Sequence, residues 1–224
     1  MILCIGEVLS AEELAQLVQV VEAGTFGDGA RTAGWHAKLV KNNHQLEGEA
    51  AETAASTVTA ALRRNATFMA ATHPIRVRPP MVSRYVPGQV YGAHVDDAVM
   101  VMGPGGTRLR TDVALTLFLS RPEDYDGGEL IIDTTAGDQV FKLTAGSMVC
   151  YPANSLHRVA PVTRGARLAA VTWVQSTVRD PAKREILFDL DRARRALFDK
   201  DGKNAQFDLL SKSYANLLRM WAEI

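Results

Sequence analysis

The chain has few cysteines, no excess of charge of either sign and no long apolar run. Its two cysteines, Cys4 and Cys150, are too few and too far apart for a disulfide framework or a zinc knuckle. Its 25 basic and 25 acidic residues cancel, so the net positive field typical of nucleic-acid-binding proteins is missing. No segment approaches the ~20 consecutive apolar residues of a membrane span. We therefore expect no nucleic-acid partner, no membrane insertion, no signal peptide and a cytoplasmic location.

The overall amino-acid composition is that of an ordinary globular protein. Hydrophobic residues make up 47% of the 224 residues and charged residues 22%, which excludes an intrinsically disordered chain. Ser10 and Glu13 form a capping-box pattern that predicts the start of a first helix. A long, alanine-rich helix is predicted over residues 47–72. The N-terminal region, residues 1–74, is therefore expected to be a helical support.

From residue 75 the pattern changes to short β-branched runs separated by glycine, proline, asparagine and aspartate. Strands are predicted at residues 81–86, 113–119, 129–133, 139–143, 147–151, 157–162 and 167–175. Hairpin turns are predicted at residues 144–146 and 163–165. Residues 101–110 form either a lid or a plain solvent loop. Many short strands at regular spacing predict a sandwich, barrel or jelly roll over residues 75–178.

The C-terminal region, residues 179–224, returns to a helical period. Its apolar positions step by three and four residues and form a narrow stripe: Phe207, Leu210, Tyr214, Leu217 and Trp221. Such a stripe usually docks on the helix's own domain. The alternative is a seam between copies of the chain, which would make a homo-oligomer through the C-terminal helix.

Three residues have the character of a metal site. His94 and Asp96 are two positions apart, so on a strand both side chains point to one face. That triplet alone favours a surface histidine beside an acid. His157, on a separate predicted strand, adds a second imidazole. Two imidazoles and a carboxylate leave open positions on an octahedral ion, which suits ferrous iron, although zinc can take the same ligands.

Arg167 follows His157 by ten residues across a predicted strand, turn and strand. A hairpin there would bring the guanidinium back beside His157. A buried guanidinium needs a carboxylate partner and can bind one through two hydrogen bonds. The distal carboxylate of 2-oxoglutarate is one such partner, and an internal salt bridge to a protein acid is the other.

Taken together, these residues resemble the iron(II)/2-oxoglutarate-dependent dioxygenases of the prolyl-hydroxylase type, and most closely the bacterial PKHD-type hydroxylases. The segment Tyr151-Pro152-Ala153-Asn154-Ser155-Leu156-His157 is one of the matching motifs. Others lie at residues 83–98, 110–112, 117–120, 124–130 and 163–167. Family-like pieces outside the core lie at residues 40–43 and 187–191. The resemblance covers nearly the whole chain.

The resemblance implies a fold, a cofactor set and a site. The fold would be α+β but mainly β, a double-stranded β-helix (jelly roll) core with flanking N-terminal and C-terminal helices. His94, Asp96 and His157 would bind Fe(2+), and Arg167 would bind 2-oxoglutarate as cosubstrate with O2. Such hydroxylases can use ascorbate (vitamin C) to keep iron reduced, and several are associated with bacterial iron uptake.

Some roles stay open at this stage. Tyr85 is a candidate cosubstrate-binding residue and Trp173 a candidate neighbour of the substrate, although a core aromatic is the commoner reading of each. Asp97 would point away from the metal, so we assign it no ligand role. The substrate is a small molecule or a peptide: peptidyl proline, an amino acid and a siderophore-like molecule all fit. A non-catalytic, cupin-like module that binds a metal or a siderophore is the alternative function.

Overall fold

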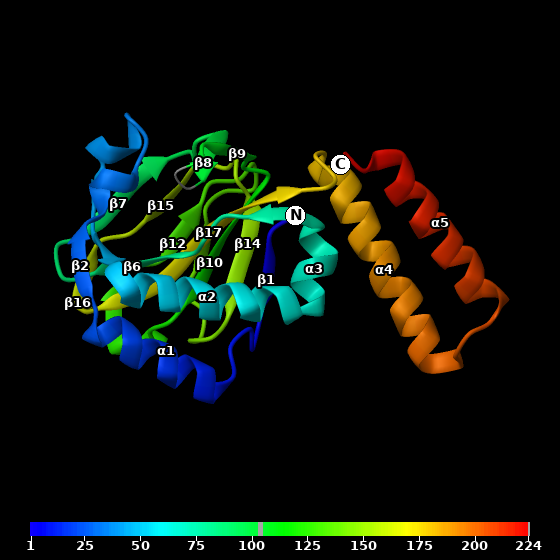
Figure 1. Ribbon diagram of the computed structural model, residues 1–224, viewed down its shortest axis with the longest axis horizontal. Coiled ribbons are helices and arrows are strands. Elements are labelled where there is room, and N and C mark those ends of the chain that lie inside the picture. The colour runs from blue at the N-terminus through cyan, green and yellow to red at the C-terminus, as the bar shows by residue number, and fades with distance from the viewer. Residues whose placement is uncertain (103–104, 224) are drawn as a thin grey trace.

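In the computed structural model, which describes residues 1–102 and 105–223, two antiparallel sheets form the body of the protein (Figure 1). The larger sheet runs in the order β1 (Leu3–Ile5), β14 (Met148–Pro152), β10 (Val113–Phe118), β17 (Arg167–Ser176), β6 (Met81–Tyr85), β4 (His44–Glu47) and β2 (Thr25–Asp28), with β5 (Pro74–Val77) paired to β17. The smaller sheet runs in the order β13 (Gln139–Phe141), β12 (Leu130–Ile132), β15 (His157–Val159), β7 (Val90–His94) and β3 (Lys41–Asn42). This arrangement confirms the predicted jelly roll.

Two further strand pairs lie outside these sheets: β8 (Val99–Met102) with β9 (Thr107–Arg110), and β11 (Tyr125–Gly127) with β16 (Val162–Gly165). Three short 3-10 helices complete the loops: η1 (Gly29–Thr32), η2 (Ala37–Leu39) and η3 (Pro122–Asp124).

Strand β10 is apolar at five of its six residues, and Thr116 is the exception. All six of its residues are buried, because both faces of the strand are covered. Val113, Leu115 and Leu117 belong to the core under the helices. Ala114 and Phe118 belong to the core between the two sheets. The cavity described below opens within that second core.

Helices α1 (Ala11–Ala23) and α2 (Gly48–Arg64) lie along one side of the larger sheet (Figure 1). The predicted capping box at α1 is present: Ser10 Oγ accepts from the Glu13 amide at 3.1 Å, and the Glu13 carboxylate accepts from the Ser10 amide at 2.9 Å. The single helix predicted over residues 47–72 is divided, however. Asn65 ends α2, and its side chain caps α3 (Ala66–Thr72) by accepting from the Phe68 amide.

Other local predictions differ from the structure. The N-terminal region is not only helical: it supplies β1 to β4 to both sheets, in strands of two to four residues that leave little periodic signal. Residues 163–165 are part of strand β16, not a turn, and pair with β11. Residues 144–146 turn between two different sheets rather than within a hairpin. The predicted loop 101–110 is mostly the β8–β9 hairpin, and residues 103–104 lie outside the described part. The region boundaries at 74 and 178 stay predictions.

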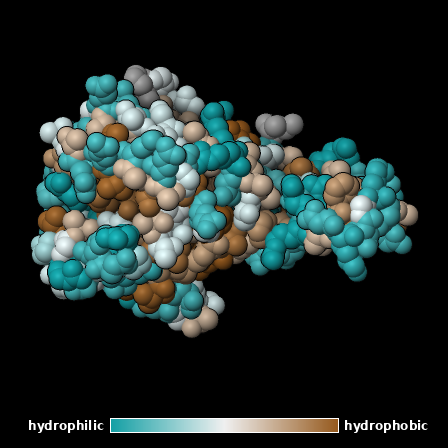
Figure 2. All heavy atoms as spheres, turned by 90° about the horizontal axis from the view of Figure 1, so that it is seen from below, coloured by the Kyte–Doolittle hydropathy of each residue, from teal (hydrophilic) through white to brown (hydrophobic). Residues whose placement is uncertain are grey.

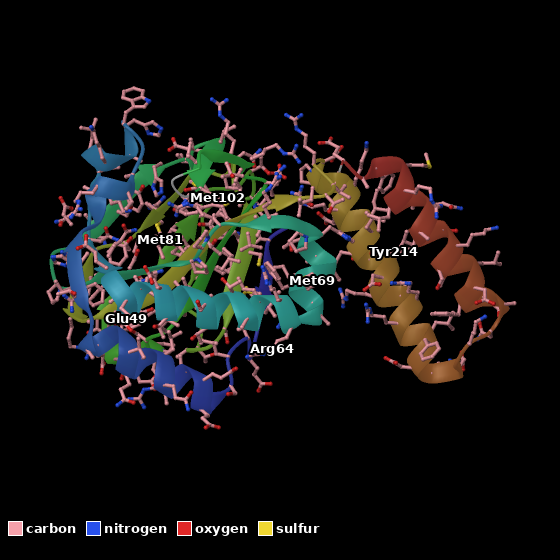
Figure 3. All side chains as sticks on the ribbon, viewed as in Figure 1. Glu49, Arg64, Met69, Met81, Met102 and Tyr214 are labelled. Atoms are coloured by element: carbon pink, nitrogen blue, oxygen red, sulfur yellow. The ribbon has the colours of Figure 1, made fainter. Side chains whose placement is uncertain are left out.

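The last two helices, α4 (Pro181–Asp201) and α5 (Ala205–Trp221), form a hairpin that projects from the body (Figure 1). The outer surface of this hairpin is largely hydrophilic in the view of Figure 2. The predicted stripe of α5 is half-buried against α4, where Tyr214 (labelled in Figure 3) lies under the guanidinium of Arg194. The docked-helix alternative therefore accounts for the stripe. None of the helices in the described residues is long and apolar enough to cross a membrane.

Replacement of Asp191 by asparagine is expected to destabilise the fold by about 2 kcal/mol. This side chain is buried in α4; burial opposes its ionisation, but hydrogen bonds from Arg195 and Arg194 outweigh burial and lower its pKa. An acid whose pKa is lower in the folded state stabilises the fold at pH values above its unfolded pKa, near ~4. This stabilisation is lost as the pH falls through the folded-state pKa. Urea unfolding at pH 7 and at pH 3 should therefore show a smaller difference between wild type and Asp191→Asn at pH 3. Asp189→Asn, an exposed neighbour, should change little at either pH.

Candidate metal and cosubstrate site

A cavity between the two sheets holds most of the candidate residues. Its wall includes His94, Asp96, His157 and Arg167, together with aromatic side chains from both sheets. Segments more than 120 residues apart in sequence contribute to it, from η1 and β3 through to β17. The predicted site residues therefore share one chamber.

The three predicted metal ligands converge. His94 ends β7, Asp96 follows it in the adjoining loop, and His157 begins β15 directly opposite His94 in the register of the two strands. One ligand atom from each of the three lies within 4.8 Å of the other two. His157 Nε2 is 3.9 Å from Asp96 Oδ2, and the two imidazole rings are 4.3 Å apart. This spacing is what a single ion bound by all three side chains requires.

Backbone carbonyls orient both imidazoles. His94 Nδ1 lies 2.8 Å from the Gly92 carbonyl oxygen, and His157 Nδ1 lies 3.0 Å from the Ser155 carbonyl oxygen. A carbonyl can only accept, so each Nδ1 carries a proton and each Nε2 is the ring nitrogen left to bind a metal. A metal-binding histidine is usually oriented in this way: the ring nitrogen that does not bind the metal donates its N–H to a backbone carbonyl or a similar acceptor.

The electrostatics of the cluster fit a cation. Burial, and then the nearby His157, lower the pKa of His94 to about 3, so its imidazole stays neutral and able to bind a metal. Burial raises the pKa of Asp96, against the lowering effect of His157 and of the Trp173 indole. Asp96 Oδ2 is buried without a hydrogen-bond partner. A buried, unpartnered carboxylate oxygen beside two imidazole lone pairs is stabilised by a bound dication.

Arg167 is the largest fully buried side chain among the described residues, with 1% of it exposed. No carboxylate of the described residues lies within 4.0 Å of its guanidinium, and its Nε is buried without a hydrogen-bond partner. Its Cζ lies over the rings of Tyr85 and Phe118, at 5.2 and 5.5 Å. The internal salt bridge considered from the sequence is therefore absent among these residues, and the buried guanidinium has no acidic partner there.

The chain leaves room for this arginine at Gly128. That residue has φ +66°, and a Cβ there would lie 3.0 Å from Arg167 Cδ and 3.1 Å from the Tyr125 ring. The left-handed backbone and the close contact both favour glycine. The sequence suggested that a hairpin brings Arg167 beside His157, and this prediction is wrong. Strands β15 and β17 belong to different sheets and face each other across the cavity.

The two tentative aromatics also line the cavity. Tyr85 is 3% exposed, and burial raises its pKa to about 12 despite the charge of Arg167, so its hydroxyl is a proton donor at neutral pH. The Trp173 indole N–H is buried beside Asp96, though not in a hydrogen bond of normal geometry. Asp97 also lines the cavity but is not part of the three-residue cluster.

Sequence reasoning missed several residues of this chamber. Tyr91 stacks on His94 with ring centroids 3.6 Å apart, and Tyr151 contacts His157 edge to face at 5.2 Å. Lys41 reaches the cavity from β3, and in the sequence only the family-like piece at residues 40–43 contains it. The pairing of β3 with β7 places it there, and no local pattern reports a pairing across 50 residues.

Comparison with known proteins places the chain in a family. Residues 80–175 match the 2OG-Fe(II) oxygenase superfamily, and residues 181–223 match the PKHD-type hydroxylase C-terminal domain. PKHD-type hydroxylases of Thermosynechococcus vestitus and Acaryochloris marina are 53% and 54% identical, each aligned over 100% of both chains. A 2OG-Fe(II) oxygenase family structure from Burkholderia pseudomallei covers 78% of this chain and 85% of its own, with a TM-score of 0.58 and 17% identity. A prolyl hydroxylase from Trichoplax adhaerens, solved with a hypoxia-inducible-factor peptide fragment, covers 83% and 86%, with a TM-score of 0.56 and 16% identity. The two structures share the fold, and the full-length identity shows that this chain belongs to the PKHD-type hydroxylases, which are 2-oxoglutarate- and iron(II)-dependent enzymes.

Proposed function

We propose that this enzyme hydroxylates a C–H bond of a small-molecule or peptidyl substrate, with His94, Asp96 and His157 as iron ligands. The observation that carries the assignment is one chamber that holds a convergent His-Asp-His cluster and a buried arginine without an acid. When bound there, ferrous iron with 2-oxoglutarate and O2 supplies the oxidising chemistry.

The side chains of the chain have separate tasks in this proposal. The two imidazoles and the Asp96 carboxylate hold the ion on one side and leave its other positions to ligands. Arg167 anchors the carboxylate of 2-oxoglutarate remote from the metal through a charge-assisted pair of hydrogen bonds. The surrounding aromatic rings of Tyr85, Tyr91 and Tyr151 exclude water and keep the histidines in place.

The direct test is formation of succinate by purified protein supplied with Fe(II), 2-oxoglutarate and air. Turnover without added substrate is expected to be slow but dependent on both the metal and 2-oxoglutarate. A chelator should stop it, and Fe(II) should restore it. Protein that binds Fe(II) but forms no succinate under any of these conditions would contradict the proposal.

The non-catalytic, cupin-like module that binds a metal or siderophore is the competing function. It needs the same three ligands but gives Arg167 no task, so the unpartnered guanidinium favours the enzyme. Addition of 2-oxoglutarate to the anaerobic Fe(II) protein separates the two. A new visible charge-transfer band supports the enzyme, and an unchanged spectrum supports the module.

Tyr85→Phe is expected to weaken 2-oxoglutarate binding by about three- to tenfold, since it removes one hydroxyl donor worth about 1 kcal/mol. The ring remains, so packing around Arg167 is kept. Titration of the anaerobic Fe(II) protein with 2-oxoglutarate measures the dissociation constant. Tyr214→Phe, in the projecting hairpin, is the matched control and should leave it unchanged. Equal constants for Tyr85→Phe and wild type would assign Tyr85 to packing alone.

The proposal for the substrate, the reductant and the cellular location is broader than that for the site. Peptidyl proline, an amino acid or a siderophore-like molecule could be the substrate, and a link to iron uptake follows from the family resemblance. Ascorbate would serve to keep the iron reduced. Both cysteines are free thiols, which supports a reducing, cytoplasmic location. Homo-oligomerisation through α5 would need surface beyond the stripe, because the stripe already packs on α4.

A further inference from the structure

The loop that carries Asp96 has no regular secondary structure of its own. It spans residues 95–98, between the end of β7 at His94 and the start of β8 at Val99. Within the described part of the chain, Asp96 Oδ2 has no hydrogen-bond partner. The position of this carboxylate oxygen therefore depends on the loop backbone that carries it.

Thr111 holds this backbone at two points. Its hydroxyl donates to the carbonyl oxygen of Asp97 at 2.7 Å, and its amide donates to the carbonyl oxygen of Ala98 at 3.1 Å. Thr111 directly follows β9, and β9 pairs with β8 along its whole length (Figure 1). The two bonds from Thr111 therefore continue the pairing of this hairpin into the loop, as far as the residue next to Asp96.

The two neighbours of Thr111 anchor it to the larger sheet. Arg110 donates to the Asp112 carboxylate from Nε at 2.8 Å and from Nη2 at 3.0 Å. The buried Asp112 carboxylate also accepts from the Ser176 amide at 2.8 Å, and the Asp112 amide donates to the Val174 carbonyl oxygen at 3.0 Å. Ser176 and Val174 belong to β17, which lies inside the sheet between β10 and β6. Thr111 is therefore fixed to the sheet through the residue that follows it, which a charge-assisted pair ties to the residue before it.

We propose that Thr111 is a positioning residue for the metal ligand Asp96. By holding the carbonyl of the next residue, its hydroxyl fixes the direction in which the Asp96 carboxylate enters the cluster. This inference rests on the function proposed above and adds a residue to its metal site. It also gives a task to the family-like motif at residues 110–112, which neither the three ligands nor Arg167 uses. Groups that orient metal ligands commonly change metal affinity by about 10- to 100-fold when they are removed.

The test measures metal affinity after removal of the Thr111 hydroxyl. Thr111→Val keeps the shape of the side chain and the backbone amide, and is expected to raise the dissociation constant for Fe(II) about tenfold. Thr111→Ala should have the same effect, whereas Thr111→Ser keeps a hydroxyl and should bind Fe(II) nearly as wild type does. Anaerobic competition between the full chain and a chromogenic chelator gives the constants. The visible spectrum of the Co(II)-loaded protein reports ligand geometry, and should change in Thr111→Val and be kept in Thr111→Ser.

Thr134→Val is the matched control. The Thr134 hydroxyl donates to the Gly137 carbonyl oxygen at 2.8 Å, so this variant loses the same kind of bond from a loop that does not line the cavity. Its Fe(II) affinity and its Co(II) spectrum should equal those of wild type.

Hydrogen exchange in the metal-free protein provides a readout that needs no bound ion. The amide at position 111 donates to Ala98, and this bond should open more often once the neighbouring hydroxyl bond is lost. The protection factor of that amide is expected to fall about fivefold in Thr111→Val, the effect of one hydrogen bond.

The outcomes separate this inference from the function on which it rests. If Asp96→Ala loses the metal but Thr111→Val and Thr111→Ala bind Fe(II) as tightly as wild type, Thr111 has a structural role only and the inference is overturned. Equal weakening of Fe(II) binding in Thr134→Val would overturn it as well. If Asp96→Ala binds Fe(II) as wild type does, the ligand set is wrong, and the proposed function is overturned with it.

Discussion

Asp96→Ala is expected to abolish 2-oxoglutarate-dependent succinate formation, with a loss of about a thousandfold or more. The carboxylate supplies the only acidic ligand of the cluster, and a bound metal contributes several kcal/mol to the chemistry. His94→Ala should have an effect of the same order. The loss should appear in metal content as well: the purified variants should hold well under one iron per chain after dialysis.

The neighbouring acid provides the matched control for metal binding. Asp97 carries the same charge one residue further along the chain but is not one of the three clustered ligands. Asp97→Asn is therefore expected to retain about one iron per chain. If Asp97→Asn loses the metal and Asp96→Ala keeps it, the two acids have been assigned the wrong way round. If both variants keep it, the ion is bound elsewhere.

Arg167→Met is expected to raise the dissociation constant for 2-oxoglutarate about a hundredfold, because it removes a buried guanidinium from a carboxylate. The same change should leave the ligand-free protein at least as stable as wild type. In the described residues this guanidinium has no acidic partner, so an apolar side chain of similar length relieves the cost of a buried charge. Thermal unfolding with and without 2-oxoglutarate measures both effects: the cosubstrate should stabilise wild type and not the variant.

Two further variants make this result specific. Arg167→Lys keeps the charge but loses the planar pair of donors, and should fall between wild type and Arg167→Met. Arg164 lies three residues earlier in an exposed ion pair with Asp126, so Arg164→Met should alter neither stability nor cosubstrate binding by more than about 1 kcal/mol. A lower melting temperature for ligand-free Arg167→Met, with normal cosubstrate binding, would show that the arginine has a structural role only.

Much of the core could be predicted because its signals are local. The strands β10 and β17 are long, apolar and bounded by polar turns, so their positions were predicted to within about a residue. The two C-terminal helices have a clear helical period after Pro181. The convergence of His94, Asp96 and His157 was expected from the resemblance to a family. The two-residue spacing of His94 and Asp96 alone favoured a surface histidine beside an acid.

The remaining features depend on contacts that no local pattern contains. Strands β3 and β4 contain only two and four residues, and each pairs with a strand more than 35 residues further along the chain. Asn65 divides a continuous helical pattern because its side chain caps the second helix better than its backbone continues the first. Lys41 looks like an ordinary surface cation in the sequence. Its position in the wall of the cavity follows only from the pairing of β3 with β7.

The most direct test of the central claim is an anaerobic crystal structure of the Fe(II) protein with 2-oxoglutarate, with diffraction data collected at the iron absorption edge. We expect one anomalous peak within bonding distance of His94 Nε2, His157 Nε2 and an Asp96 carboxylate oxygen, and 2-oxoglutarate with its distal carboxylate on the Arg167 guanidinium. An iron peak bound by other side chains, or 2-oxoglutarate oriented away from Arg167, would contradict the account.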